Sequence, residues 1–313
     1  MTNYSYLIRP NASAANGQFH GYKTRLHAVR LIVIHTGETA ADEIGNDNSA
    51  ENLSSFMSHT PVRVSWHGTT DSDSVIHELP HGFTGFHVSG YNSSSIGIEQ
   101  GIYARDWKNI STTHSDAMID NLALLVAWYC QIYEIPVIWL PVKDAIGGGR
   151  GIASHASLNP ATRTDPGRDF PLSNFLKRTK FYMDAPIYGI GDGNLYRPEL
   201  KEKIKATQEL LRSNGYGELV GATDGDAGPK FDDAVRKAER DAGLSSTGLY
   251  SSLRLFKEAP VEPKTDQGPW PTPNPVPTPV PPTTPNDANC EYDVLATLGG
   301  KVVDFDQIII TKN

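Results

Sequence analysis

The sequence predicts an α/β domain followed by a smaller, all-α domain. In the first half of the chain, short apolar runs such as residues 31–34 alternate with helical stretches, which is the order typical of α/β proteins. This alternation ends near residues 185–186, and residues 200–214 and 230–242 then carry the pattern of helices with polar outer faces. A chain of 313 residues is long enough for two such domains.

The longest predicted helix in the α/β part runs from about residue 115 to residue 133. Its apolar residues recur at three- and four-residue spacing, and Ser115 is the expected N-cap. Pro136 ends the helix, because proline lacks the amide hydrogen that a helix needs. Residues 137–140 are apolar and are expected to form the next strand.

A proline-rich stretch follows the helical domain. Residues 259–289 hold 11 of the 22 prolines, and alternating proline removes the donors that helices and sheets require. We interpret it as an extended spacer; a ligand for an SH3-type domain is the alternative. The remaining residues 290–313 are strand-like at 302–303 and 308–310, but they are too few to form a core. The predicted division is therefore 1–185, 186–258, 259–289 and 290–313, and the role of the last segment stays open.

Composition excludes several classes of protein. The formal net charge is −8 and no block of Lys or Arg occurs, which argues against a nucleic-acid partner. No window approaches 18 uninterrupted apolar residues, so no membrane span is predicted. The two cysteines, Cys130 and Cys290, cannot form a disulfide framework or a cysteine-rich zinc site. The first residues lack the pattern of a secretory signal, so production in the cytoplasm is expected.

The histidines suggest a metal site. Nine of the ten lie before residue 115, and the tenth is His155. His35 directly follows an apolar strand, where a side chain emerges from the sheet, and Asp165 follows His155 by ten residues. Two imidazoles and a carboxylate suit a catalytic zinc ion that keeps a fourth position open for water. Each of the three is common elsewhere, so their spacing alone does not establish the site.

Three sequence motifs strengthen this interpretation. They are LIVIHT at residues 31–36, TGFHVSGYNSSSIGIE at 84–99, and the segment from SHA to RTDPG at 154–167. In this order they resemble the type 2 N-acetylmuramoyl-L-alanine amidase family, which includes T7-like phage lysozymes and peptidoglycan recognition proteins. The resemblance covers about residues 28–178. It implies a mixed central sheet flanked by helices, and Zn²⁺ held by His35, His155 and Asp165 in a groove for the peptidoglycan stem peptide.

The same resemblance suggests catalytic roles for two more residues. Glu99 stands where some family members carry a catalytic Glu, which implies proton transfer; a solvated carboxylate at a strand end is the alternative. Arg163 occupies a position that is often Lys in the family. Its fixed positive charge suits stabilisation of the oxyanion in the transition state, whereas it cannot pass on a proton.

Three further residues are predicted to contact substrate. They are His87 and Asn92, both within the second motif, and Trp66, which replaces a Tyr that is catalytic in many relatives. Trp has no ionisable hydroxyl, so either packing or stacking on a sugar is expected of Trp66, and a structural role is expected of His67. Four other histidines match no motif and are expected at the surface: His59, His77, His81 and His114.

The second domain resembles the small three-helix peptidoglycan-binding domain. Residues 205–216, 223–228 and 231–244 carry its pattern of helix, Asp-Gly turn and helix, although residues 237–239 lack a usual core aromatic. A generic helical packing domain is the alternative.

Together the two resemblances predict a phage endolysin. Such an enzyme would hydrolyse the amide between MurNAc and L-Ala with zinc, would accumulate in the host cytoplasm, and would reach the cell wall after the membrane is breached. Peptidoglycan is the expected partner, with neither nucleic acid nor membrane, and the oligomeric state is open. The alternatives are a recognition protein that binds without cutting and a peptidase that cuts within the stem peptide.

Overall fold

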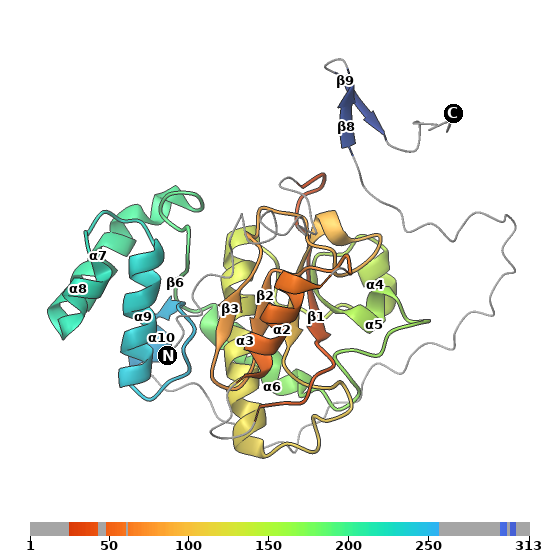
Figure 1. Ribbon diagram of the computed structural model, residues 1–313, viewed down its shortest axis with the longest axis horizontal. Coiled ribbons are helices and arrows are strands. Elements are labelled where there is room, and N and C mark those ends of the chain that lie inside the picture. Colours follow the sequence, from red (N-terminus) through yellow and green to blue (C-terminus); the bar gives the residue numbers. More distant parts are fainter. Residues whose placement is uncertain (1–24, 43–47, 61, 257–294, 299–300, 305–313) are drawn as a thin grey trace, which may run out of the picture.

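The computed structural model describes residues 25–42, 48–60, 62–256, 295–298 and 301–304 (Figure 1). Its main body is built on a five-stranded sheet of order β3-β2-β4-β1-β5. The strands are β1 (Leu31–Thr36), β2 (Gly68–Thr70), β3 (Val75–His77), β4 (Ser95–Gln100) and β5 (Gly151–Ser154). Only the β2–β3 pair is antiparallel. The sheet is therefore mixed, as the family resemblance implies.

Helices cover both faces of this sheet. The helices of the main body are α2 (Ser49–His59), α3 (Thr112–Tyr133), α4 (Val142–Ile146), α5 (His155–Leu158) and α6 (Leu172–Tyr182). Ile32 and Ile34 of β1 share one core with α3 and α6, whereas Leu31 and Val33 share another with α4 and α5. Successive side chains of a strand point to opposite faces, so His35 belongs to the α4–α5 face.

The start of α3 lies earlier than the sequence predicts. Ser111, not Ser115, is the N-cap, and its side chain accepts a hydrogen bond from the backbone amide of His114. The first turn is polar, so it adds nothing to the apolar pattern from which the start of the helix was predicted. The end of the helix at Tyr133 is confirmed.

The strand predicted at residues 137–140 is wrong. This segment makes a single isolated bridge, Trp139 to Ile152, and is otherwise irregular. Pro136 and Pro141 stand at its two ends, and neither can donate to a sheet. β5 instead takes the place beside β1.

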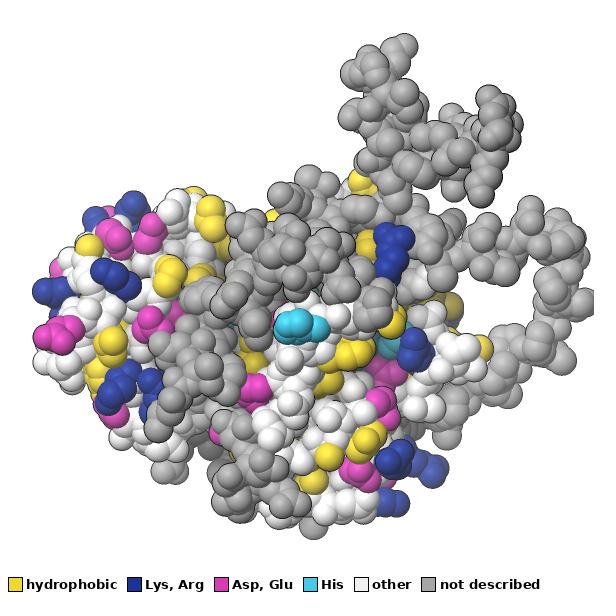
Figure 2. Space-filling model, viewed as in Figure 1, with side chains coloured by type: hydrophobic (Ala, Val, Ile, Leu, Met, Phe, Trp, Pro, Cys, Tyr) yellow, Lys and Arg dark blue, Asp and Glu magenta, His cyan; other side chains and the backbone are white. Residues whose placement is uncertain are grey.

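The helical part contains α7 (Lys201–Leu211), a kinked turn (Arg212–Tyr216), α8 (Gly217–Val220), α9 (Pro229–Asp241) and α10 (Ser252–Phe256). A core that includes Ile204, Leu211, Phe231 and Val235 holds it together. The prediction of an all-α domain misses one element, the ribbon formed by β6 (Ile187–Tyr188) and β7 (Tyr250–Ser251). In the view of Figure 2, acidic and basic side chains are interspersed over this part, without a patch of one sign.

Buried contacts join the helical part to the main body. Ile187 and Leu249 pack into the same core as Trp128 of α3. The Trp128 indole donates to Asp192 at 2.9 Å, and Arg236 of α9 donates to the carbonyl of Val75 at 3.1 Å. The two parts therefore share a core, and the boundary predicted between residues 185 and 186 stays a prediction.

These contacts explain a wrong prediction about two histidines. His77 and His81 are 1% and 4% exposed, not surface residues. The centroid of the Tyr196 ring, just before α7, lies 3.6 Å from that of the His81 ring. Burial, together with the charge of Arg236 of α9, lowers the pKa of His77 to about 3. Residues more than 100 positions away in the sequence cover them.

The remaining predictions about the chain ends are mostly untested. Near the C-terminus, β8 (Leu295–Leu298) pairs with β9 (Lys301–Asp304), which includes the predicted strand at 302–303. The spacer at 259–289, Cys290 and residues 308–310 lie outside the described residues. Cys130 is buried as expected, and burial raises the pKa of its thiol to about 12. Among the described residues, no helix is long and apolar enough to cross a membrane.

Candidate metal centre and active site

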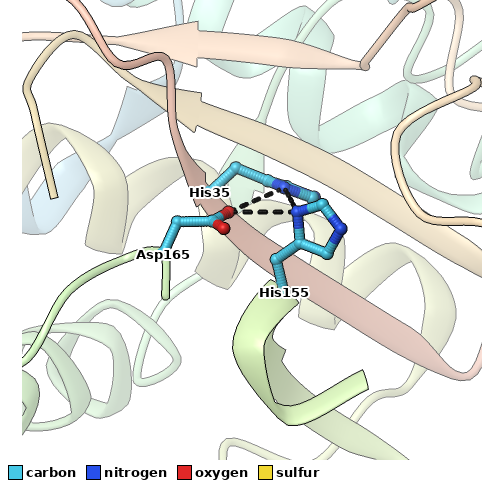
Figure 3. A group of neighbouring side chains, drawn as sticks. All are labelled: His35, His155 and Asp165. Atoms are coloured by element: carbon cyan, nitrogen blue, oxygen red, sulfur yellow. Dashed lines mark hydrogen bonds and ion pairs between the residues drawn. The ribbon is translucent and has the colours of Figure 1, made fainter. Parts of the chain in front are cut away.

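The three predicted metal ligands meet at the carboxyl ends of the central strands (Figure 3). His35 Nδ1 and His155 Nδ1 lie 3.0 Å apart. Asp165 Oδ2 lies 3.2 Å from His35 Nδ1 and 3.1 Å from His155 Nδ1. One ligand atom from each side chain thus points at the same small space, although the three residues come from separate segments of the chain.

The fold holds each of these residues differently. His35 is in β1, which pairs with β4 on one side and β5 on the other. His155 is the first residue of α5, directly after β5, and Ser154 caps that helix. Asp165 lies in a loop, where its carbonyl accepts from the amide of Ala156 at 3.0 Å.

Gly167 lets that loop approach the main body closely. Its φ is +106°, a conformation that side chains disfavour. A Cβ here would also lie 1.9 Å from the carbonyl oxygen of Ala104. The glycine of the Asp-Pro-Gly sequence is therefore required for the position of Asp165.

The donor set fits a zinc ion. Burial lowers the pKa of His35, so its imidazole is neutral and offers a lone pair at neutral pH. Burial alone would raise the pKa of Asp165, but the rings of His155 and His35 beside its Oδ2 hold that pKa well below its usual range, and the carboxylate stays charged. Two imidazoles and one carboxylate form a typical set of protein ligands for a catalytic zinc ion.

Glu99 lies beside this cluster. In the parallel β1–β4 pair Glu99 is the partner of His35, so both side chains leave the same face of the sheet. Its Oε2 is buried and makes no hydrogen bond to any described residue. Burial, together with the charges of Asp165 and Glu38, raises its pKa well above the ordinary value. Glu99 is therefore a carboxyl group that holds its proton unusually tightly.

Arg163 supplies positive charge from the rim of the site. Its side chain is exposed, two residues before Asp165. Its guanidinium lowers the pKa of both His35 and Glu99, so its charge acts on the metal centre although no hydrogen bond joins them.

His87 and Asn92 lie close to the centre, with Asn92 in a structural position. His87 Nδ1 is 3.1 Å from His35 Nε2. The side-chain oxygen of Asn92 accepts from the backbone amides of His87 and Val88, at 3.0 and 2.8 Å. This oxygen is thus already engaged within the loop. Contact of either residue with substrate stays a prediction.

Trp66 and His67 lie in the interior. The Trp66 side chain is buried, and its indole donates to Thr69 Oγ1 at 2.7 Å, which fits packing better than stacking on a sugar. His67 Nδ1 accepts from the amide of Gly97 at 3.0 Å, and its Nε2 lies 3.0 Å from the carbonyl of Phe83. Both residues therefore support the sheet from within, and a contact between Trp66 and substrate stays a prediction.

Sequence reasoning missed two residues next to the centre, Ser95 and Gly97. Ser95 Oγ lies 3.2 Å from His87 Nε2, and the ring of His87 lies against Gly97. Both belong to the SIGIE motif, which marks where they stand in the sequence without indicating what they do. The structure also brings together Asp42, Asp71 and Asp73, an acidic cluster that no motif indicated.

Comparison with protein families identifies both parts of the chain. Residues 25–168 match the family model described as N-acetylmuramoyl-L-alanine amidase, and residues 200–252 match a putative peptidoglycan binding domain. No curated protein sequence matches the chain.

Several solved structures resemble the chain at low identity. A mutant of PlyL is 16% identical over 56% of this chain and 96% of that chain, with a TM-score of 0.38. The PlyG catalytic domain is 18% identical over 57% and 93%, with a TM-score of 0.39. The Staphylococcus aureus hydrolase AmiA is 16% identical over 49% and 71%, with a TM-score of 0.36.

The family matches agree with the two resemblances in the sequence, and the sheet agrees with the fold that the first one implies. Residues 25–168 are therefore a domain of the N-acetylmuramoyl-L-alanine amidase family, residues 200–252 are a peptidoglycan-binding domain, and peptidoglycan is the partner of the chain.

Proposed function

We propose that this protein hydrolyses the amide bond between MurNAc and L-Ala in peptidoglycan, with a zinc ion held by His35, His155 and Asp165. The observation that supports this most is the convergence of these three side chains within a domain of the amidase family. A zinc ion bound there would act as a Lewis acid and would lower the pKa of a bound water toward 7.

Glu99 is the proton-transfer residue in this proposal. It takes a proton from the attacking water and gives it to the nitrogen of the leaving L-alanine. Its raised pKa suits it to hold a proton, and a cation among the neighbouring ligands would lower that pKa and ease release of the proton. Because Glu99 pairs with His35 in the sheet, its carboxyl group stays beside the ligands.

Arg163 stabilises the negative charge that develops on the carbonyl oxygen during attack. Its exposed guanidinium can move toward the substrate, and its charge already acts on Glu99 and His35. Positive charge next to the developing oxyanion lowers the barrier more than it lowers the energy of the bound substrate.

The helical part keeps the enzyme on its polymer. A binding domain joined to a catalytic domain raises the local concentration of cleavable bonds and lengthens residence on the wall. The shared core fixes the direction in which the metal centre faces relative to the binding domain.

The direct test is to incubate the purified protein with purified peptidoglycan, with and without a zinc chelator, and to identify the new ends by mass spectrometry. The proposal requires new L-alanine amino termini and free lactyl carboxylates on muramic acid, lost on chelation and restored by zinc. Binding without release would instead identify a recognition protein. New ends within the stem peptide would identify a peptidase.

We further propose that the protein acts as a phage endolysin, made in the host cytoplasm. The combination of a cutting and a wall-binding domain in one chain supports this role. Expression inside a susceptible bacterium should leave the cells intact until the membrane is permeabilised, and should then lyse them. Lysis without permeabilisation would contradict it.

A further inference from the structure

A chain of hydrogen bonds leads away from the proposed metal site on the far side of His35. His35 Nε2 lies 3.1 Å from His87 Nδ1. His87 Nε2 lies 3.2 Å from Ser95 Oγ, and this hydroxyl lies 2.8 Å from the backbone carbonyl oxygen of Tyr91. The chain thus runs from a metal ligand through two side chains to a fixed backbone acceptor.

The positions of the protons follow from that last acceptor. A carbonyl oxygen can only accept, so the Ser95 hydroxyl donates its single hydrogen to the carbonyl oxygen of Tyr91. Toward His87, Ser95 can then only accept, which requires the hydrogen of the neutral His87 ring to be on Nε2. Nδ1 of His87 is therefore an acceptor, and the hydrogen of His35 must be on Nε2. This leaves the lone pair on His35 Nδ1, the atom that faces His155 and Asp165.

We infer that His87 and Ser95 are positioning residues that fix the tautomer and the orientation of His35 for metal binding. This inference rests on the proposed zinc site and deepens it. The second partner of a metal-binding histidine is commonly a carboxylate or a backbone carbonyl. In this protein the carbonyl of Tyr91 serves that purpose at a distance, through a serine and a second histidine. His87 thereby has a role in the free enzyme that does not depend on substrate.

The surroundings of His87 are built to hold its ring. A Cβ on Gly97 would lie 2.4 Å from the nearest ring atom of His87, so only glycine at this position of β4 leaves room for the imidazole. Asn92 accepts from the amide of His87 and fixes its backbone. Gly97 and Asn92 thus place His87 between His35 and Ser95.

The first test measures the tautomers directly in the metal-free full-length protein, by nitrogen NMR of ¹⁵N-histidine-labelled material. His35 and His87 should both carry their hydrogen on Nε2, with Nδ1 of each unprotonated. A hydrogen on Nδ1 of His35 would overturn the inference. No substrate is used, so the result is independent of whether the amide is cleaved.

The second test measures zinc affinity by competition with a chromogenic chelator. Ser95→Ala should weaken zinc binding about 10-fold and His87→Ala about 10- to 100-fold. The matched control is Ser94→Ala, because Ser94 Oγ also donates to the Tyr91 carbonyl but does not contact His87. It should bind zinc as the parent does. Equal affinities for Ser95→Ala and Ser94→Ala would overturn the inference.

Two further variants separate positioning from folding. Gly97→Ala keeps every hydrogen-bonding group but displaces the His87 ring, so it should weaken zinc binding while His87 is still present. Ser95→Thr keeps the hydroxyl and should restore most of the affinity that Ser95→Ala loses. If these substitutions change the thermal midpoint but leave the zinc affinity unchanged, the role of His87 and Ser95 is structural. If zinc binds as described but no amide is cleaved, the proposed function fails and this inference holds.

Discussion

Arg254 of α10 donates a hydrogen bond of 2.8 Å to Asp120 of α3, which precedes it by 134 residues. The Arg254 side chain is 3% exposed and also contacts Glu239 of α9, whose side chain is fully buried. This pair joins the helical part to the longest helix of the amidase domain through charges that water hardly reaches. Removing this ion pair should therefore destabilise the helical part and the amidase domain together.

Replacing Arg254 by Met should destabilise the whole protein. The substitution leaves two carboxylates, Asp120 and Glu239, without their shared cation, and breaking a buried ion pair typically costs about 3 kcal/mol. Urea unfolding of the full-length protein measures the loss. Arg240→Met is the control, because Arg240 is exposed and its guanidinium donates to Ser246 Oγ at the surface. Equal losses in the two variants would contradict the prediction.

Ending the chain at residue 185 should destabilise the amidase domain. Ile187 and Leu249 would leave its core, and the indole of Trp128 would lose Asp192 as acceptor. A buried donor without a partner costs about 1–3 kcal/mol, in addition to the exposed apolar surface. The thermal midpoint of residues 1–185 should lie well below that of residues 1–256. Coincident midpoints would show that the domains are independent.

Asp165→Ala should abolish tight zinc binding and amidase activity together. The substitution removes the only carboxylate among the three proposed ligands, and with it the charge that offsets the cation. Metal content after dialysis and release of L-alanine ends are the two measurements. Asp169→Ala, in the same segment but outside the cluster, should retain both. Activity of Asp165→Ala at the parent level would refute the ligand assignment.

Glu99→Gln should keep zinc and lose turnover. A glutamine has nearly the same shape but cannot transfer a proton, so kcat should fall by about 10²- to 10⁴-fold. Glu38→Gln removes another carboxylate that contributes to the raised pKa of Glu99, and it should change kcat far less. If both variants lose activity equally, negative charge near the site is what matters, and proton transfer by Glu99 is refuted.

Glu78 should make the protein less stable as the pH rises. Burial raises the pKa of its carboxyl group from 4.5 to about 7, despite hydrogen bonds from Ser54 and Thr69. Below pH 4.5 the group is protonated in both the folded and unfolded states and has no effect. Between pH 4.5 and 7 only the unfolded state gives up the proton, so the free energy of unfolding falls by about 3 kcal/mol.

Glu78→Gln isolates this contribution, since the amide mimics the protonated acid. The variant should be more stable than the parent at pH 8 and equal to it near pH 4. Urea unfolding at both values measures this, with the exposed Glu218→Gln as control. A gain that is the same at both pH values would mean that ionisation of Glu78 is not its cause.

The sequence predicts that His35, His155 and Asp165 lie together, because they stand within short motifs at or near the ends of predictable elements. His35 lies near the end of an apolar strand, and Asp165 stands in an Asp-Pro-Gly turn. A parallel arrangement of strands then brings such ends to one edge of the sheet. The apolar character of residues 137–140 predicts a strand, but Pro136 and Pro141 at its ends keep it from joining the sheet as one.

Other features depend on contacts that no local pattern contains. His81 looks like a surface residue until Tyr196 covers it, and Asp120 shows no sign of its partner Arg254. His87 could be assigned to the substrate groove by resemblance alone. Its relation to Ser95 emerges only when the loop before β4 folds back onto that strand.

The central position of β1 has a consequence for the proposed metal site. Its backbone is bonded on both edges, whereas Asp165 belongs to a loop. Amide protons of Ile32 and Ile34 should therefore be among the last to exchange with deuterated solvent, and those around Asp165 among the earlier ones. In the proposed metal site, ions of different radius would then be accommodated by movement of the carboxylate, while the imidazole of His35 keeps its place.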